Sequence, residues 1–344
     1  MLSQKIIEWY QENKRILPWR RTKDPYRIWL SEIIMQQTRV DQGLPYYDSF
    51  VTLFPTVYDL AAAEESEVLR TWQGLGYYSR ARNLHKTAKR IVDDYNGIFP
   101  KSSIDLLELK GIGPYTSAAI SSICYDEPKA VVDGNVYRVL SRLYEIGTPI
   151  NSSAGIKTFA HLAQSLITSY KPGDFNQGMM EIGATVCTPK KPKCHVCPIS
   201  YTCNALQNNS QLSFPTKLKK AKLKDRYFNY LVIRSQGKIF LKKRELKDIW
   251  IGLYEFFLIE SMDRVADLDV LKKSLPEWLK DPSITHSPIY TKQILSHQRI
   301  YAQFWILDLE RIPQLTSYSF YNLTEIDSLP KHRLIEKYLL EYLK

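Results

Sequence analysis

Hydrophobic residues recur every three to four positions through most of the first 208 residues, which is the spacing of helices with one buried face. The stretch 106–142 predicts a helix, a hairpin, a second helix, a connection and a third helix. No segment of this part alternates as a strand does. The other predicted helices are 5–16, about 28–40, 57–96 and 136–186. We therefore expect an all-α domain over residues 1–208.

The pattern changes near residue 227, where short apolar runs with strand-like alternation begin. YLVIRSQGKIFLKKRE predicts two strands joined at 235–238, and IWIGLYEFFLIE predicts another strand region. Alternate apolar positions predict a half-buried strand in ILSHQRIYAQFWIL: Ile300, Ala302, Phe304 and Ile306. Helical spacing returns at 267–278 and 325–343. Residues 227–344 therefore predict an α+β domain.

Residues 209–226 differ in composition from both domains. KLKKAKLKDR, at the end of this stretch, has six basic residues and one acidic residue. It predicts an interdomain linker, which either lies along DNA or is only a solvated tether. The formal net charge is +11, with +9 in residues 1–226 and +2 in residues 227–344. This distribution favours a polyanionic partner, although a generic basic surface has the same charge.

The length of 344 residues allows two or three domains, and no run of eighteen apolar residues predicts a transmembrane helix. The N-terminal stretch MLSQKIIEWYQENKR is charged and lacks the apolar region of a secretory signal. We expect a cytoplasmic protein, nucleoid-associated if bacterial, with no membrane partner.

Four of the five cysteines lie within seventeen residues, in the spacing C-x6-C-x2-C-x5-C: Cys187, Cys194, Cys197 and Cys203. Clustered thiols in a cytosolic chain indicate a metal site rather than disulfides. The compact, unequal spacing favours a four-iron cluster over zinc, although thiolate ligation permits either. The first gap carries three lysines and no acid, and is expected to face phosphate: Lys190, Lys191 and Lys193. Cys124 lies in an apolar helix and is expected to pack as a small hydrophobe.

The segment LKGIGPYT places Gly111 and Gly113 just before a predicted helix. Both glycines are expected to take positive φ and to let a partner approach the backbone. N–H groups at the start of the helix can then bind phosphate without reading sequence. An ordinary turn is the alternative, but Asp133, twenty residues after Gly113 and just before another helix, favours phosphate binding.

Glu32 shares a helical face with mostly apolar neighbours, among them Trp29 and Met35. Burial on this face would raise its pKa and suit it to general-acid catalysis, whereas a solvated face is the usual position of a helical glutamate.

The turn GLGY (74–77) presents Leu75 and Tyr77, which either wedge between bases or pack between helices.

Together these motifs resemble the adenine DNA glycosylase (MutY) family of the helix–hairpin–helix glycosylase superfamily, over nearly the whole chain. The resemblance implies an all-α helix–hairpin–helix domain with a [4Fe–4S] cluster loop, followed by an α+β Nudix-like domain. It also implies excision of adenine mispaired with 8-oxoguanine or guanine in double-stranded DNA. The matching segments are LPWR (17–20), PYRIWLSEIIMQQTRV (25–40), GLGYYSRARNL (74–84), LKGIGPYT (109–116), VDGNV (132–136), the four cysteines and SHQ (296–298).

The resemblance assigns the catalytic roles. Glu32 matches the acid that protonates adenine N7, and Asp133 matches the carboxylate that stabilises the oxocarbenium-like sugar. Asn135 and Tyr115 match residues that position Asp133 and the sugar. Asp133 also has the position of a helix N-cap, whose hydrogen bonds should keep it ionised. Endonuclease III-like relatives carry a lysine at the place of Tyr115, and tyrosine forms no Schiff base. We therefore expect a monofunctional glycosylase.

The resemblance also assigns DNA contacts. Ser296 and His297 match the loop that reads 8-oxoguanine, although the phenylalanine usual before them is Leu295 here. No REXXEE acidic run follows 252–256, so we expect a reading domain and not a pyrophosphatase. The three lysines and the two hairpin glycines are already expected to bind DNA. The further expected DNA-binding residues are Arg20, Gln37, Thr38, Leu75 and Tyr77. The resemblance implies that all of these except Arg20 hold or replace bases around the flipped adenine.

We expect one [4Fe–4S] cluster per chain, a monomer, and other repair or replication proteins as further partners. In such folds the hairpin carbonyls near 107–112 can also hold an alkali or alkaline-earth ion.

Three other functions compete with the adenine glycosylase. An endonuclease III-like glycosylase and lyase is disfavoured by Tyr115 and the second domain. A catalytically silent DNA-binding protein is disfavoured by the two carboxylates, and a Nudix hydrolase by the missing acidic run.

Overall fold

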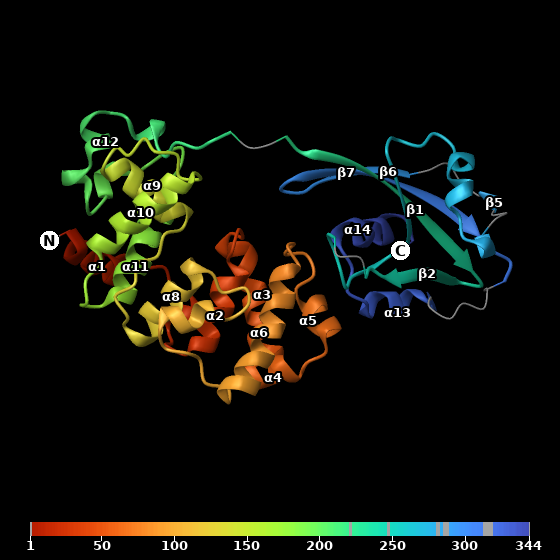
Figure 1. Ribbon diagram of the computed structural model, residues 1–344, viewed down its shortest axis with the longest axis horizontal. Coiled ribbons are helices and arrows are strands. Elements are labelled where there is room, and N and C mark those ends of the chain that lie inside the picture. The colour runs from red at the N-terminus through yellow and green to blue at the C-terminus, as the bar shows by residue number, and fades with distance from the viewer. Residues whose placement is uncertain are drawn as a thin grey trace. The chain divides into compact units, whose positions relative to one another are not determined.

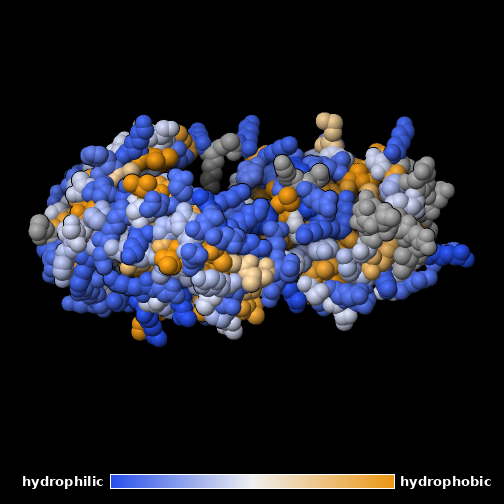
Figure 2. All heavy atoms as spheres, turned by 60° about the horizontal axis from the view of Figure 1, so that its bottom comes forward, coloured by the Kyte–Doolittle hydropathy of each residue, from blue (hydrophilic) through white to orange (hydrophobic). Residues whose placement is uncertain are grey.

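The computed structural model describes residues 2–219, 222–245, 248–279, 283–284, 289–311 and 319–343. The chain forms two compact units. The first contains Met1–Ala63 and Asn83–Lys219, and the second contains Glu64–Arg82 and Lys220–Lys344. No helix in the described ranges is long and apolar enough to cross a membrane. Hydrophilic side chains cover most of the face drawn in Figure 2, with apolar ones scattered among them.

The first unit is helical, as the hydrophobic spacing predicts (Figure 1). A π-helical turn, Ile182–Val186, continues its helix α11 toward the first clustered cysteine. The helix α6, Ser79–Tyr95, begins in the second unit's segment and continues into the first. The other helices of the first unit are α1 (Leu2–Asn13), α2 (Pro25–Ile34), α3 (Val40–Leu53), α4 (Val57–Ala62), α7 (Ser103–Leu107), α8 (Pro114–Tyr125), α9 (Gly134–Leu143), α10 (Ser153–Leu166), α11 (Pro172–Glu181) and α12 (Asn204–Gln207).

Helix α8 lies at the centre of this unit and packs against α2, α7 and α11. Its middle residues Ala118, Ala119 and Ile120 are fully buried or nearly so. Small side chains allow neighbouring helices to approach closely, so α2 and α8 bring their polar residues to one place. That packing positions Glu32 of α2 beside Tyr115 of α8.

The predicted helix 28–40 is wrong at both ends. Helix α2 begins at Pro25, after Asp24 accepts a hydrogen bond from the Tyr26 N–H at 3.0 Å, and ends at Ile34. Gln37 then adopts the left-handed region with φ 56°, which no α-helix can continue through. The polar segment 36–38 is therefore a turn between two helices, and Glu32 lies in the last turns of α2.

The second unit is α+β, as predicted. Strand β1 pairs in parallel with β7 over eleven residues, from Lys224↔Gln298 to Arg234↔Asp308, and antiparallel with β2 and β4. One face of the sheet packs a core that includes Leu231, Phe240 and Trp305. The strands and helices are α5 (Glu65–Thr71), β1 (Lys224–Ser235), β2 (Lys238–Lys243), β3 (Tyr254–Glu255), β4 (Phe257–Ser261), β5 (Ser283–Ile284), β6 (Ile289–Ile294), β7 (Gln298–Asp308), β8 (Ser319–Tyr321), α13 (Leu323–Ser328) and α14 (Arg333–Tyr342).

Two predicted helices of this unit differ from the structure because of proline. The segment 267–278 forms two short 3-10 turns, Leu268–Ser274 and Glu277–Leu279, on either side of Pro276. The segment 325–343 is divided into α13 and α14, with Pro330 between them. Proline removes a backbone N–H and disfavours helix at the preceding residue, so it outweighs the apolar spacing at both places.

The predicted linker 209–226 is attached at both ends. The Ile150 N–H donates to the Thr216 carbonyl at 3.1 Å, and the Leu218 N–H donates to Asn151 at 2.7 Å, which holds this part on the first unit. Strand β1 already begins at Lys224. Residues 220 and 221 lie outside the described residues.

Candidate active site

A cleft of about 420 Å³ opens on the first unit, between the start of the chain, α2, α8, α9 and α11. It is lined by the four residues expected to carry the chemistry: Glu32, Tyr115, Asp133 and Asn135. The sequence reasoning missed several other residues of its wall, among them Arg15, Trp19, Gln177, Met180 and Glu181. No local motif marks these positions, because they come together only through the packing of α11 on the N-terminal segment.

Glu32 is half-buried in this cleft, and the Tyr115 hydroxyl donates a hydrogen bond to its Oε2 at 2.6 Å. Burial raises the pKa of Glu32 to about 7, and the nearby charge of Asp133 acts in the same direction. The Tyr115 hydroxyl and Arg20 oppose this increase. A carboxyl with a pKa near 7 can deliver a proton near neutral pH, which is the requirement for a general acid at that pH.

Asp133 is the N-cap of α9. Its Oδ1 accepts from the Asn135 and Val136 N–H groups at 2.9 and 2.8 Å, and its Oδ2 accepts from the Asn135 amide at 2.8 Å. The predicted N-cap position of Asp133 is confirmed, but the direction in which its pKa is shifted is not the expected one. Burial raises the pKa of Asp133 above its ordinary value, and the hydrogen bonds offset only part of that effect. The helix N-terminus nevertheless favours the carboxylate form.

Asn135 is held in place on its other side by Arg138. The Arg138 guanidinium donates to Asn135 Oδ1 at 2.9 Å, to the Gly183 carbonyl at 2.6 Å and to the Cys187 carbonyl at 2.7 Å. A Cβ atom on Gly183 would lie 2.5 Å from the Asn135 Cβ, so only glycine permits this close approach. The orientation of Asp133 therefore depends on the segment that leads to the first clustered cysteine.

Tyr115 lies at the start of α8, directly after the hairpin. Burial raises the pKa of its hydroxyl well above the ordinary value, and the Glu32 and Asp133 charges act in the same direction. Its hydroxyl also lies 3.2 Å from the Met180 sulfur. The group is therefore a neutral hydrogen-bond donor that orients Glu32, and it has no amine with which to attack a sugar.

Arg20, expected to bind DNA, is not on the exposed surface. Its side chain is 9% exposed and donates to Glu181 Oε2 at 2.8 Å. Arg15 donates to both oxygens of Glu181, each at 2.8 Å. Burial acts to raise the pKa of Glu181, but the two guanidinium groups hold it at about 2. The pair fixes one wall of the cleft, and Arg20 places positive charge near Glu32.

Of the residues expected to contact bases, Thr38 lines the cleft, and Gln37 is exposed in its left-handed turn. In the second unit, Tyr77 is 45% exposed with φ 48°, whereas Leu75 is only 7% exposed. Insertion of Leu75 into DNA would therefore require the turn to rearrange. Tyr77 is already presented to solvent.

In the hairpin, Gly111 has φ +83°, and a Cβ there would lie 2.8 Å from the Asn83 Cβ. Gly113 has φ −97° as the N-cap of α8, so the expected positive φ is wrong for it. Apart from its two chain neighbours, no heavy atom of the described residues lies within 4 Å of a Cβ built on Gly113, which leaves its backbone open to a partner. The approach of a phosphate to the N-terminus of α8 remains a prediction, and the open backbone at Gly113 supports it.

The alkali-ion expectation also remains a prediction. Two of the hairpin carbonyls already accept hydrogen bonds from α6. Thr87 donates to the Lys110 carbonyl at 2.6 Å, and Arg90 donates to the Glu108 carbonyl at 2.5 Å. An ion would have to share these oxygens or use their neighbours.

The four clustered cysteines line one small cavity beside Arg142. Among the described residues, no group of three or more His, Cys, Asp or Glu side chains is arranged to hold a single metal ion. Arg142 is buried and donates to the Thr188, Pro189 and Gln211 carbonyls at 2.8, 3.0 and 2.8 Å, and to the Cys187 sulfur at 3.3 Å. The cysteine loop is thereby fixed to α9. Lys190, Lys191 and Lys193 are exposed on it.

Ser296 and His297 lie exposed at the tip of the hairpin between β6 and β7. The Leu295 N–H donates to the Gln298 carbonyl at 2.8 Å and closes the turn, so leucine is compatible with a tight loop here. Both polar side chains are available to a ligand.

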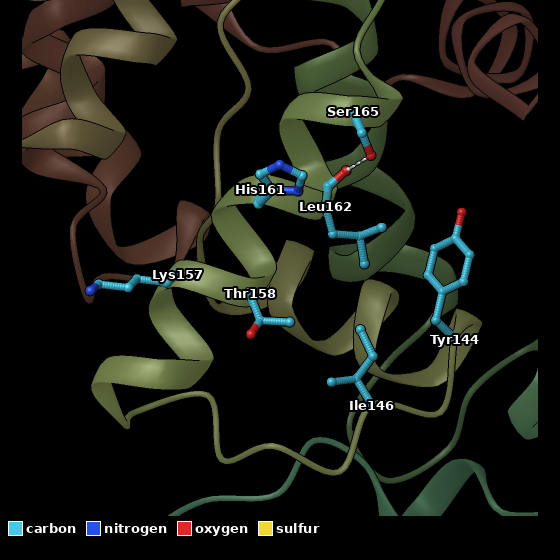
Figure 3. Close-up of a pocket in the computed structure, with 7 residues that line it drawn as sticks. All are labelled: Tyr144, Ile146, Lys157, Thr158, His161, Leu162 and Ser165. Atoms are coloured by element: carbon cyan, nitrogen blue, oxygen red, sulfur yellow. Dashed lines mark hydrogen bonds between the residues drawn. The ribbon is translucent and has the colours of Figure 1, made fainter.

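A second hollow on the first unit, of about 580 Å³, is less suited to catalysis (Figure 3). Leu162 and Tyr144 face it, and Lys157 and His161 stand at its rim on α10. None of its lining residues is a carboxylate. The smaller cleft with two carboxylates is therefore the candidate active site.

Comparison with known proteins gives three family matches. Residues 30–161 match the HhH-GPD superfamily of base excision DNA repair proteins, residues 187–203 match the iron-sulfur binding domain of endonuclease III, and residues 229–341 match the NUDIX domain. The iron–sulfur match resolves the metal alternatives: the four cysteines belong to a [4Fe–4S] domain, as predicted.

Similar whole proteins are adenine DNA glycosylases. The chain is 34% identical over 322 residues to that of Buchnera aphidicola subsp. Schizaphis graminum, covering 93% of this chain and 89% of the relative. It is 42% identical over 215 residues to that of Homo sapiens, covering 60% of this chain and 39% of the relative. Among solved structures, a thermostable thymine-DNA glycosylase matches with a TM-score of 0.55 and 32% identity, covering 60% of this chain and 95% of that one. An endonuclease III–DNA complex, 20% identical, supports the fold, with a TM-score of 0.52 over 60% of this chain and 94% of that one.

Proposed function

The chain belongs to the adenine DNA glycosylase family, and from that membership we propose that it hydrolyses the N-glycosidic bond of adenine mispaired with 8-oxoguanine or guanine in double-stranded DNA. The observation that carries the proposal is the pair of carboxylates in one cleft with different surroundings. Glu32 has a pKa near 7 and accepts from a tyrosine, whereas Asp133 is held by three donors at a helix N-terminus. Such a pair can supply one acid and one anion at the same pH.

The proposed reaction begins with the adenine flipped out of the duplex, because the bond is not accessible inside the stack. Protonated Glu32 transfers its proton to adenine N7. The C1′–N9 bond then breaks, and its electron pair leaves with the neutral base. The carboxylate of Asp133 stabilises the cationic sugar, and a water molecule adds to C1′ and loses a proton, which leaves an abasic site.

The role proposed for Tyr115 is to orient Glu32, through the 2.6 Å hydrogen bond that its hydroxyl donates. Since it has no amine, no Schiff base forms with the sugar at this position. We therefore assign no efficient strand-cleaving step to this chain. The clustered lysines, held by the cysteine loop that the [4Fe–4S] cluster cross-links when bound, are proposed to contact the phosphate backbone.

Recognition of the opposite base is assigned to Ser296 and His297. Their exposure at the tip of the β6–β7 hairpin supports the assignment, since neither side chain is committed to the sheet. Hydrogen bonds to groups that distinguish 8-oxoguanine from guanine would make excision from 8-oxoguanine:A faster than from G:A.

The test is single-turnover adenine release from 8-oxoguanine:A and G:A duplexes, with and without alkali, by the wild type and by a Ser296→Ala, His297→Ala variant. We expect strand cleavage of the wild-type product only after alkali. The double variant should lose about tenfold of its preference for 8-oxoguanine:A, the effect of one to two hydrogen bonds, with little change on G:A. Wild-type cleavage of oxidised pyrimidine duplexes without alkali would instead support a glycosylase and lyase. An equal loss on both adenine duplexes would assign 296–297 to general binding.

A further inference from the structure

The turn at 74–78, here called the wedge turn, is hydrogen-bonded to the C-terminal part of the second unit. Gln73 accepts from the Lys331 N–H at 2.8 Å and donates to Glu336 Oε1 at 2.7 Å. The Tyr78 hydroxyl donates to the Lys331 carbonyl at 3.1 Å and accepts from the Gly74 N–H at 3.3 Å. The turn is thereby joined at both of its ends to one residue more than 250 positions later in the chain.

Lys331 is itself fixed to the sheet. It pairs with Tyr254 of β3 in an isolated bridge, and the Tyr254 N–H donates to the neighbouring Pro330 carbonyl at 2.8 Å. Its side chain is buried and donates to the Leu329 carbonyl at 2.7 Å and to the Ile326 carbonyl, at the end of α13. A second attachment lies nearby, since Arg82 donates to the Ile251 carbonyl at 2.5 Å. Displacement of this part of the sheet would therefore move the wedge turn.

The wedge turn has a conformation that depends on such support. Gly74, Gly76 and Tyr77 have φ values of 102°, 73° and 48°. The left-handed region is unfavourable for a tyrosine, so surrounding contacts must stabilise it. The Trp72 indole donates to the Gly76 carbonyl at 3.0 Å, and the Arg80 guanidinium lies 5.6 Å from the Tyr77 ring centre. With these contacts in place, Tyr77 as a whole residue is still 45% exposed.

We propose that Gln73 and Tyr78 are positioning residues that couple recognition of the opposite base to the presentation of Tyr77. Binding of 8-oxoguanine by the β6–β7 hairpin restrains the sheet, whose hydrogen-bonded strands run from β6 through β7, β1 and β2 to β3, the strand that Lys331 pairs with. Lys331 then holds the wedge turn with Tyr77 outward, ready to fill the space that the adenine leaves. This inference rests on the proposed function, because it requires the β6–β7 hairpin to read the opposite base.

The test replaces Gln73 with leucine, which has a similar size and cannot make the hydrogen bonds to Lys331 and Glu336. Single-turnover excision and 2-aminopurine fluorescence, with 2-aminopurine in place of the adenine, are measured opposite 8-oxoguanine and opposite guanine. We expect excision and the fluorescence increase opposite 8-oxoguanine to fall by about tenfold, as for two hydrogen bonds, and by less than about twofold opposite guanine. Tyr78→Phe should act in the same direction, and provides a second variant if Gln73→Leu folds poorly.

Two controls separate positioning from general structure. Gln4→Leu removes the exposed hydrogen bond from Gln4 to Glu8 in α1 and should change neither measurement. Glu336→Gln retains an acceptor for Gln73 and should behave almost as the wild type.

The decisive comparison is a cycle with Ser296→Ala, His297→Ala. If the signal passes through Gln73, Gln73→Leu should add little in the background that lacks the reading residues. Additive losses, equal losses on both duplexes, or no loss from Gln73→Leu and Tyr78→Phe would overturn the coupling. Failure of the reading assignment itself is seen separately, as unchanged discrimination in the Ser296→Ala, His297→Ala variant alone.

Discussion

Glu32→Gln should stabilise the protein while it abolishes catalysis, and the gain should depend on pH. The folded chain raises the pKa of Glu32 from 4.5 to about 7, so folding disfavours its charged form. At low pH the carboxyl is protonated in both states and the folded state suffers no penalty. The stabilising contribution of the protonated form is fully present below pH 4.5, and it is lost as the pH rises from 4.5 to about 7.

The size of the effect follows from that change in pKa. At about 1.4 kcal/mol per pKa unit, the charged carboxylate lowers the free energy of unfolding by about 3 kcal/mol at pH 8, or about 2 kcal/mol when solvent screening of a half-buried group is allowed for. Glutamine has no charge to bury and keeps an acceptor for the Tyr115 hydroxyl. The variant should therefore melt about 5 °C above the wild type at pH 8, and above it by only about a quarter of that difference at pH 5, where the unfolded carboxyl is mostly ionised and the folded one is not.

Thermal unfolding of wild type, Glu32→Gln and Glu12→Gln at the two pH values, with the iron–sulfur cluster retained, measures this difference. Glu12 is exposed on α1, and its replacement should leave the melting temperature unchanged at both pH values. A stabilisation that is equal at pH 5 and pH 8 would refute the electrostatic reasoning. So would a variant that is less stable than the wild type at pH 8.

Three further predictions concern other parts of the mechanism. Asp133→Asn should lower single-turnover adenine release at least about hundredfold, because an amide cannot stabilise the sugar cation; near-normal release would exclude Asp133 from that role. Iron analysis of anaerobically purified protein should find about four irons per chain, and Cys194→Ser should lose them and bind duplex DNA more weakly; one zinc without iron would contradict the cluster. Tyr115→Lys should allow borohydride trapping of an enzyme–DNA adduct that the wild type forms poorly, and efficient wild-type trapping would favour a lyase.

The features that could be predicted from the sequence are those determined by residues close together in the chain. Asp133 precedes an apolar helical stripe and is its N-cap, and the face of Glu32 is apolar and is buried. Proline and the conformation of Gln37 broke three predicted helices, because a single residue can end a helix that hydrophobic spacing alone would extend. The helical first unit and the α+β second unit nevertheless match the periodicities from which they were predicted.

The sequence could not predict features that depend on distant packing. Arg20 and Glu181 are 161 residues apart, and nothing near Arg20 indicates that it is buried in an ion pair. The hydrogen bonds of Gln73 to Lys331 and Glu336 span 258 and 263 residues, between segments with unrelated patterns. Burial around Asp133 likewise comes from several elements, so its effect on the pKa outweighed the hydrogen bonds that the N-cap position predicted.

The central claim is that Glu32 provides the proton that releases adenine. It is tested most directly by single-turnover release of adenine from an 8-oxoguanine:A duplex by the wild type and Glu32→Gln, with the affinity of each for the same duplex measured alongside. The account predicts release by the wild type, and no detectable release by Glu32→Gln at an affinity within a few-fold of the wild type. Release by Glu32→Gln at the wild-type rate would contradict it.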